Sequence, residues 1–427
     1  MAQNDHSTLR LGCTYWPRRR GPWFWNEHFD RGEIRGELDH LADLGCELVR
    51  VLLPWALFQP QPALIARTAF DQFGQLLDTG EAARVSLVPV LFVGALGGIR
   101  FLPRWLLRVA ASRGQALAER EPRPRTISEG WLYAGAIQNF YEQRDLVNAQ
   151  RFLIRELVGY FGPHPALAGW DLGGGDLITH IPPRAPEAAL GWLEQLTTAA
   201  QEADPQHPCW YGGDSGLLLA PTAPRVHEIS QIIDRLALSV VPFISQTARG
   251  PADHEFILYT LQLTGTLAET GGRPLGCLGT GVPAAAPGLV EEVIEVKSDD
   301  PKAPPRRFHL PSEKVQADFM YELIPAAQTA GVPFLFNMTY ANAPVDLWGV
   351  PPLDEAVPLR RLGLVRADGR EKPAAAAWRD LAGRLAHDEL GAFGRDARTL
   401  DIDTDEFYAA PAATFQRWYR RMREGEI

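Results

Sequence analysis

Short apolar, strand-like runs alternate with longer amphipathic segments along most of this chain. Such alternation is typical of repeated strand–helix units that build a parallel sheet. Strands are expected at 9–15, 47–53, 85–93, 167–172, 209–212, 236–241, 274–278 and 332–338. Eight strands with intervening helices predict an α/β fold, a closed (β/α)8 TIM barrel.

The segments between the expected strands carry helix signals. Asp30 precedes apolar residues at helical spacing and is expected to cap that helix, with Glu33 as its capping-box partner. Gly45 follows the last turn, where glycine commonly ends a helix. Further helices are expected at 145–159, 186–202, 255–270 and 315–330.

The length of 427 residues fits one barrel, because this fold can exceed 400 residues when it carries insertions. We expect the barrel to span 1–385 and a charged helical extension, 386–427, to pack on it. The stretches 96–141 and 288–312 interrupt the alternation and are interpreted as inserted loops, the second containing a hairpin. Both loops are candidate surfaces for a protein partner.

Composition excludes several classes of function. The net charge of −10 is spread along the chain, which disfavours nucleic acid as a partner. The four cysteines show no metal-ligand spacing, so we expect neither a metal nor another cofactor, and Cys46 and Cys277 fit buried free thiols. No apolar run is long enough to span a membrane and no secretory leader is visible, so the expected location is cytoplasmic.

A functional site in this fold is expected where the strands end, because the C-terminal face of the barrel carries the active site. Aromatic side chains are dense at these ends, and sugar rings stack on aromatic faces. The candidate saccharide contacts are Tyr15, Trp16, Trp55, Trp105, Phe243, Asn337, Tyr340 and Trp348. The alternative for each tryptophan is that it fills the core.

Several stretches together resemble the clan A, family 5-like glycoside hydrolases. They are GCTYWP, LADLGCELVRVLLPWALFQPQP, HPALAGWDLGGGDL and RPLGCLGTGVP, and the resemblance covers about residues 10–380. It implies a TIM barrel that hydrolyses glycosides with two catalytic glutamates. It also implies that Arg50 supports the catalytic carboxylates and contributes to the substrate site.

The departures from the family pattern fall on the residues that perform the reaction. Where the family has W-D-L-x-N-E, this chain has Gly175 at the acid/base position, and Gly279 stands at the nucleophile position. Ala95 replaces a usual histidine, and the usual His–Pro–Tyr pattern of the sixth strand appears as Val241-Pro242-Phe243. Retaining hydrolysis needs two carboxyl groups about 5–5.5 Å apart. Glycine supplies neither group, so we infer that retaining hydrolysis is lost.

Other polar residues near the strand ends are possible substitutes. Asp176 and Asp214 are the candidates for an inverting pair, which needs carboxyl groups about 6.5–9.5 Å apart. Asp176 also fits a cap for the turn before Leu177. Asp171 is expected to be a buried partner of Arg50, and His180 a loop or surface residue.

Three hypotheses follow for the function. The first is a pseudoenzyme that binds a carbohydrate or a glycosylated partner in the old cleft. The second is an active glycoside hydrolase that uses displaced carboxylates such as Asp176 and Asp214. The third is a scaffold or regulatory protein whose loops contact another protein. Fold similarity alone does not choose between them.

Overall fold

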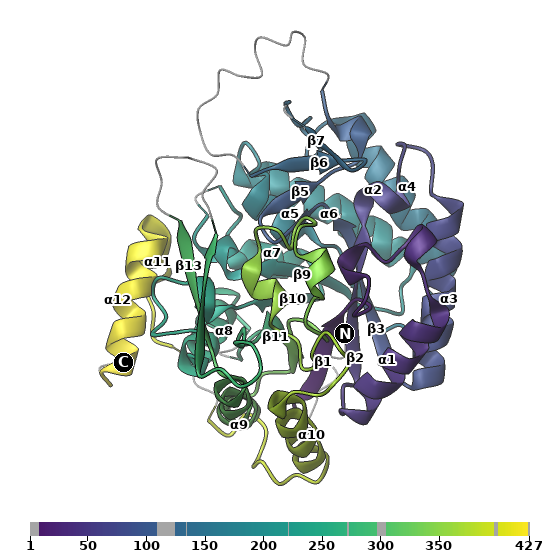
Figure 1. The fold of residues 1–427 in the computed structure, drawn as a ribbon. Helices are drawn as coiled ribbons and strands as arrows, with labels where there is room; N and C mark the ends of the chain where they lie inside the picture. Colours follow the sequence, from purple (N-terminus) through teal and green to yellow (C-terminus); the bar gives the residue numbers. More distant parts are fainter. Residues whose placement is uncertain are drawn as a thin grey trace.

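The structure is a computed structural model that describes residues 8–425, except 109–123, 134, 221, 271–272, 297–304 and 397–399, and except the side chains of 174–176. Eight parallel strands form a closed barrel in the order β1-β14-β11-β10-β9-β8-β3-β2 (Figure 1). They are β1 (Arg10–Tyr15), β2 (Leu48–Pro54), β3 (Ser86–Val93), β8 (Trp170–Asp171), β9 (Cys209–Asp214), β10 (Arg235–Ser239), β11 (Gly276–Thr280) and β14 (Phe334–Asn337). The predicted (β/α)8 barrel is confirmed.

Helices connect the strands, as the amphipathic segments predict. They include α1 (Arg31–Asp43), α3 (Arg67–Ala83), α4 (Arg144–Phe161), α6 (Pro186–Ala203), α7 (Val226–Ile232), α8 (His254–Leu267), α9 (Glu313–Ala330) and α10 (Pro373–Ala386). Asp30 caps α1 by accepting the backbone N–H groups of Gly32 and Glu33. The Glu33 side chain does not complete a capping box with Asp30 but accepts the backbone N–H of Arg19.

The two interruptions form small sheets at the barrel mouth. The first contains β4 (Ala95–Leu96), β5 (Ile99–Phe101), β6 (Thr126–Ser128) and β7 (Trp131–Tyr133). The second is the expected hairpin, of β12 (Glu291–Val296) and β13 (Arg306–Pro311). At the end of the chain, α11 (Thr404–Ala409) and α12 (Pro411–Arg423) lie on the side of the barrel that carries β13 (Figure 1).

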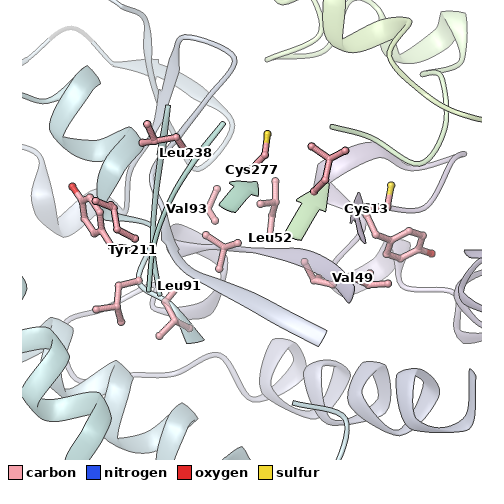
Figure 2. Close-up of a cluster of buried hydrophobic side chains, with 14 of the residues drawn as sticks. Cys13, Val49, Leu52, Leu91, Val93, Tyr211, Leu238 and Cys277 are labelled. Atoms are coloured by element: carbon pink, nitrogen blue, oxygen red, sulfur yellow. The ribbon is translucent and has the colours of Figure 1, made fainter. Parts of the chain in front are cut away.

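Alternating residues of the strands build two apolar clusters. One set faces outward to the helices and includes Cys13, Val49, Leu91 and Cys277 (Figure 2). The other set faces the inside of the barrel and consists of Leu48, Val88, Trp210, Ala237, Leu278, Phe334 and Phe336. Because side chains fill the lower barrel, space for a ligand is left at the strand ends.

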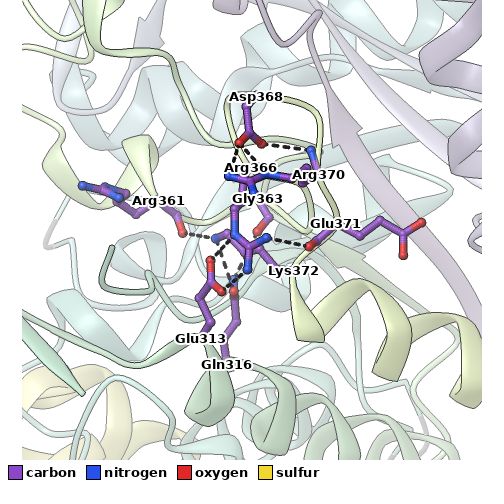
Figure 3. A network of polar contacts seen from close by, with 9 residues as sticks. All are labelled: Glu313, Gln316, Arg361, Gly363, Arg366, Asp368, Arg370, Glu371 and Lys372. Atoms are coloured by element: carbon purple, nitrogen blue, oxygen red, sulfur yellow. Dashed lines mark hydrogen bonds and ion pairs between the residues drawn. The ribbon is translucent and has the colours of Figure 1, made fainter. Parts of the chain in front are cut away.

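A polar network holds α10 against α9 (Figure 3). The buried ammonium group of Lys372 donates to the carbonyl oxygen of Arg361 at 2.9 Å and to Oε1 of Gln316 at 3.3 Å. Beside it, Arg366 donates to both carboxylate oxygens of Glu313, at 2.9 and 2.6 Å. Burial lowers the pKa of Lys372 to about 7. The network fixes the return of the chain from β14 to the outer helix layer.

All four cysteines are free and buried, as expected for Cys46 and Cys277. Within the described ranges, no helix has both the length and the apolar character needed to cross a bilayer.

Candidate functional site

A cavity of about 810 Å³ lies at the C-terminal ends of the barrel strands. Its lining includes Thr14 from β1, Arg50 from β2, Asp214 from β9 and Ser239 from β10. Met338, directly after β14, also lines it. The cavity therefore occupies the place where barrels of this type carry their sites.

The floor of the cavity contains a buried ion pair. The guanidinium group of Arg50 donates to Oδ2 of Asp171 from Nε at 2.9 Å and from Nη2 at 2.8 Å. Oδ1 of Asp171 accepts the backbone N–H groups of Gly173 and Gly212, at 2.9 and 3.1 Å. The expected pairing of Asp171 with Arg50 is confirmed. Every strong acceptor site of the carboxylate is used, which is what a fully buried charge requires.

Glycine at 212 makes room for this pair. A Cβ atom there would lie 2.5 Å from Oδ2 of Asp171 and 3.0 Å from Nη2 of Arg50. Any side chain at 212 would therefore displace the ion pair, so this strand-end glycine has a structural role.

A second polar group in the cavity consists of Asp214 and His180. Asp214 ends β9 and its Oδ1 accepts the backbone N–H of Gly216 at 2.6 Å. Burial raises the pKa of the Asp214 carboxyl, against the opposing effect of His180. Burial likewise lowers the pKa of His180, against the opposing effect of Asp214. Each shift is towards the uncharged form, and the electrostatic effect of each group on the other shows that the two side chains lie near each other in the lining.

The position of His180 corrects the expectation that it is a loop or surface residue. It ends the short helix α5 (Gly174–His180), lines the cavity and is partly buried. Its carbonyl oxygen accepts the guanidinium Nε of Arg100 at 2.8 Å, which ties the end of α5 to β5. No local pattern signals this, because the contact depends on how the inserted sheet packs.

The two glycines that stand at the family's catalytic positions belong to strand ends that β9 and β10 separate in the barrel. Gly175 lies in α5, directly after β8, and Gly279 lies near the end of β11. A Cβ atom at 279 would lie 2.8 Å from the sulfur of Met338 and 3.1 Å from the hydroxyl oxygen of Ser239. The space next to Gly279 is thus already filled, mainly by the end of a flexible methionine side chain.

Asp176, the other proposed substitute, lies in the first turn of α5. The helix begins at Gly174, so Asp176 is inside the helix and does not precede it as a cap. Its side chain lies outside the described part of the structure.

Glu355 is a carboxylate of the cavity lining that is not among the predicted site residues. It lies in the loop after β14, and its Oε1 is 2.5 Å from Nε of Arg125 in an ion pair. Among the described side chains, Asp214 and Glu355 are the carboxylates that line the cavity. Nothing in the local sequence around Glu355 marks it, since a loop residue reaches the mouth only through the fold.

Three of the nine predicted substrate contacts line the cavity: Trp16, Arg50 and Phe243. The other six do not, and they are Tyr15, Trp55, Trp105, Asn337, Tyr340 and Trp348. The polar groups of three of them are hydrogen-bonded elsewhere: Tyr15 donates to Glu37, Trp105 to the carbonyl of Gln59, and Trp348 to the carbonyl of Ala343. Among the described residues, Trp16 is the one tryptophan in the lining and no tyrosine lines it, and contact of these side chains with a saccharide stays a prediction.

The aromatic part of the lining consists mainly of phenylalanines. They are Phe243 after β10, Phe256 on α8, Phe308 on β13 and Phe415 on α12. The inserted hairpin and the C-terminal helix thus complete the cavity wall, which is predominantly apolar. Their part in the site could not be read from strand-end positions.

Comparison with known proteins agrees with this architecture. No family model matches the chain. A family 5 subfamily 18 (GH5_18) protein from Streptomyces cattleya, solved as a glutamate-to-alanine variant in complex with Manβ1-4GlcNAc, aligns with a TM-score of 0.72 at 20% identity, over 98% of this chain and 92% of that chain. A GH5_18 protein from Bifidobacterium longum subsp. infantis aligns with a TM-score of 0.68 at 18% identity, over 98% of this chain and 90% of that chain.

Two further relatives match over a smaller share of their own length. The exo-β-1,4-mannosidase Op5Man5 from Opitutaceae bacterium strain TAV5 aligns with a TM-score of 0.66 at 20% identity, over 90% of this chain and 60% of that chain. A curated relative, "Probable mannan endo-1,4-beta-mannosidase C" from Aspergillus terreus, is 27% identical over 100 residues, which are 21% of this chain and 24% of that protein. The chain therefore has the barrel fold of the family 5 glycoside hydrolases, and the matched stretch spans about a quarter of its curated relative.

Proposed function

We propose that this barrel, with the fold of the family 5 glycoside hydrolases, binds a saccharide in its strand-end cavity without hydrolysing it. The observation that carries the proposal is Gly279. It brings no carboxylate to the position that the family resemblance assigns to the nucleophile, and the Met338 side chain fills the adjoining space. Loss of a covalent nucleophile usually lowers the rate by orders of magnitude.

The floor of the cavity supports binding of a polyhydroxylated ligand. Arg50, His180 and Asp214 are among the polar side chains that line a cavity of about 810 Å³, which is within the roughly 300–1,000 Å³ range of small-molecule sites. Trp16 adds a ring at the same mouth. The S. cattleya relative holds Manβ1-4GlcNAc while one glutamate is replaced by alanine. This disaccharide is therefore the first ligand to test.

One observation favours a second function, hydrolysis by displaced carboxylates. The raised pKa of Asp214 suits a general acid, which must be protonated before it donates to the leaving group. Its partner would be another carboxylate. Glu355 is ion-paired with Arg125, and Asp176 lies on α5. We favour binding without turnover because hydrolysis needs a second carboxylate. Among the described side chains of the lining, the other carboxylate is Glu355, which is ion-paired with Arg125.

A hydrolysis assay separates the two functions. The purified protein is incubated with a panel of aryl glycosides, manno-oligosaccharides and Manβ1-4GlcNAc, beside an active clan A enzyme as positive control. We expect no turnover above the uncatalysed background. Turnover that disappears in Asp214→Asn but persists in Asp318→Asn, a surface control on α9, would overturn the proposal and identify a displaced catalytic acid.

A further inference from the structure

The outer wall of the cavity comes from segments outside the barrel strands. Phe243 and Ile244 lie in the turn after β10, Phe308 lies on β13, and Phe415 lies on α12. These side chains present hydrocarbon only. The polar floor at Arg50 and the apolar outer wall therefore belong to one continuous cavity with two different chemistries.

The contribution of α12 to this wall is built into the fold. The ring of Phe415 packs against Phe256 and Tyr259, with centroid distances of 5.7 and 5.6 Å. One turn later, the hydroxyl group of Tyr419 donates to Oδ2 of the buried Asp253 at 2.8 Å. The C-terminal helix is thus fixed to the start of α8 by an aromatic cluster and a buried hydrogen bond.

The chemistry of the outer wall selects against an unsubstituted sugar. Gln246, Arg306 and Gln416 of this region are exposed to solvent and form a rim, and the partly buried Ser245 already accepts the backbone N–H groups of Thr247 and Ala248. Thr260, deeper in the wall, already donates its hydroxyl to the carbonyl of Phe256. Sugar hydroxyls placed against Phe243, Ile244, Phe308 and Phe415 would lose water without gaining partners from these side chains, whereas a hydrocarbon group there buries apolar surface.

We infer that the cavity takes an amphipathic glycoside, with its sugar on the polar floor and an alkyl or aryl aglycone against Phe243, Ile244, Phe308 and Phe415. This inference rests on the proposed function, because it assigns the second half of the same ligand. The C-terminal helix is then a specificity element of the site.

A homologous series of ligands tests the inference. Methyl, butyl and hexyl β-D-mannosides are titrated calorimetrically into the full chain below the concentrations at which they form micelles, with Manβ1-4GlcNAc and hexanol as comparison ligands. We expect the dissociation constant to fall roughly fourfold for each buried methylene group. Hexanol, which lacks the sugar, is expected to bind more weakly than hexyl mannoside.

Two variants locate the aglycone. Phe415→Ala removes the ring that α12 contributes, and Ile244→Ser changes a 64% exposed side chain that the fold does not depend on. The matched control is Val345→Ser, which changes a 72% exposed apolar side chain outside the cavity. Ile244→Ser is expected to weaken hexyl mannoside binding several-fold and leave methyl mannoside binding unchanged, whereas Val345→Ser changes neither.

The outcomes separate the two proposals. A dissociation constant that does not depend on chain length, or a dependence that persists in both cavity variants, would overturn the inference while leaving saccharide binding intact. No binding of any glycoside would overturn the proposed function together with the inference that rests on it. Hexanol that binds as tightly as hexyl mannoside would overturn the proposed function, since the sugar would then contribute nothing.

Discussion

At the end of β2, Trp55 is fully buried, with Phe92, Trp105 and Phe140 packed edge-on at centroid distances of 5.1–5.8 Å. At the end of β10, Phe243 is half-buried and lines the cavity. Both are aromatic residues that follow a barrel strand. Trp55 is packed into the core and closes its side of the barrel mouth, whereas Phe243 forms part of the cavity wall on the open side. An aromatic residue at a strand end therefore shows that the mouth is apolar, but not on which side a ligand enters.

The largest expected effect is on the closed side. Trp55→Ala should lower the free energy of unfolding by about 3–5 kcal/mol, because it leaves a cavity in a packed aromatic cluster. Phe243→Ala should lower it by about 1 kcal/mol and weaken ligand binding instead. Denaturant unfolding of both variants measures the contrast. Equal losses of stability would contradict the distinction between the two sides.

The next effect concerns the buried ion pair of Arg50 on β2 with Asp171 on β8. Arg50→Met should lower the free energy of unfolding by about 3 kcal/mol, because it leaves the buried Asp171 carboxylate without its charged partner. Arg67→Met, at an exposed pair on α3, should change it by less than about 0.5 kcal/mol. Urea denaturation provides the comparison. An Arg50→Met variant as stable as the control would show that water reaches Asp171.

The third prediction tests how the open side is held together. Burial raises the pKa of Asp253, but hydrogen bonds from Arg249, Tyr419 and the backbone N–H of Phe256 outweigh this and lower it to about 2. The folded-state pKa is below the ordinary value of 3.8, so the stabilisation is present above about pH 4 and is lost as the pH falls towards 2. Melting temperatures of the wild type and Asp253→Asn, measured from pH 5 to pH 2.5, should therefore converge at the acid end. A constant gap across this range would contradict the assignment.

The smallest expected effect is at Gly279. Gly279→Ala should lower the free energy of unfolding by about 1 kcal/mol, because the new methyl group displaces the flexible Met338 side chain. In a Met338→Ala background the same change should be close to neutral. A double-mutant cycle on thermal or urea unfolding measures the coupling. Additive effects of the two substitutions would show that Met338 does not fill this space.

Local patterns were sufficient for the barrel itself. The expected strands agree with the observed ones within a few residues. The fourth is shortened because its pairing is interrupted between the isolated bridge of Leu167 with Leu87 and the pairs at Trp170 and Asp171. The Arg50–Asp171 pair was also predictable, because a buried arginine requires a partner and Asp171 ends the right strand. These features depend on residues close in sequence or on the barrel geometry alone.

The walls of the cavity were not predictable in the same way. His180, Glu355 and Phe415 reach it from a short helix, a loop and the C-terminal extension. Their positions depend on packing between segments far apart in the chain, such as Phe415 on Phe256. Conversely, Tyr15 and Trp55 stand at strand ends but are buried by their neighbours. The periodicity of apolar residues predicts which face of a helix or strand is apolar. It does not predict whether another segment of the chain packs on that face or leaves it open to the cavity.

The most direct measurement is a single NMR experiment with purified protein and Manβ1-4GlcNAc. Broadening of the ligand signals reports binding, and the appearance of free mannose and N-acetylglucosamine signals reports cleavage in the same tube. The account predicts saturable broadening, reduced in Asp214→Asn, with the disaccharide intact after prolonged incubation. Release of the two monosaccharides above the background rate, or no broadening at any protein concentration, would contradict it.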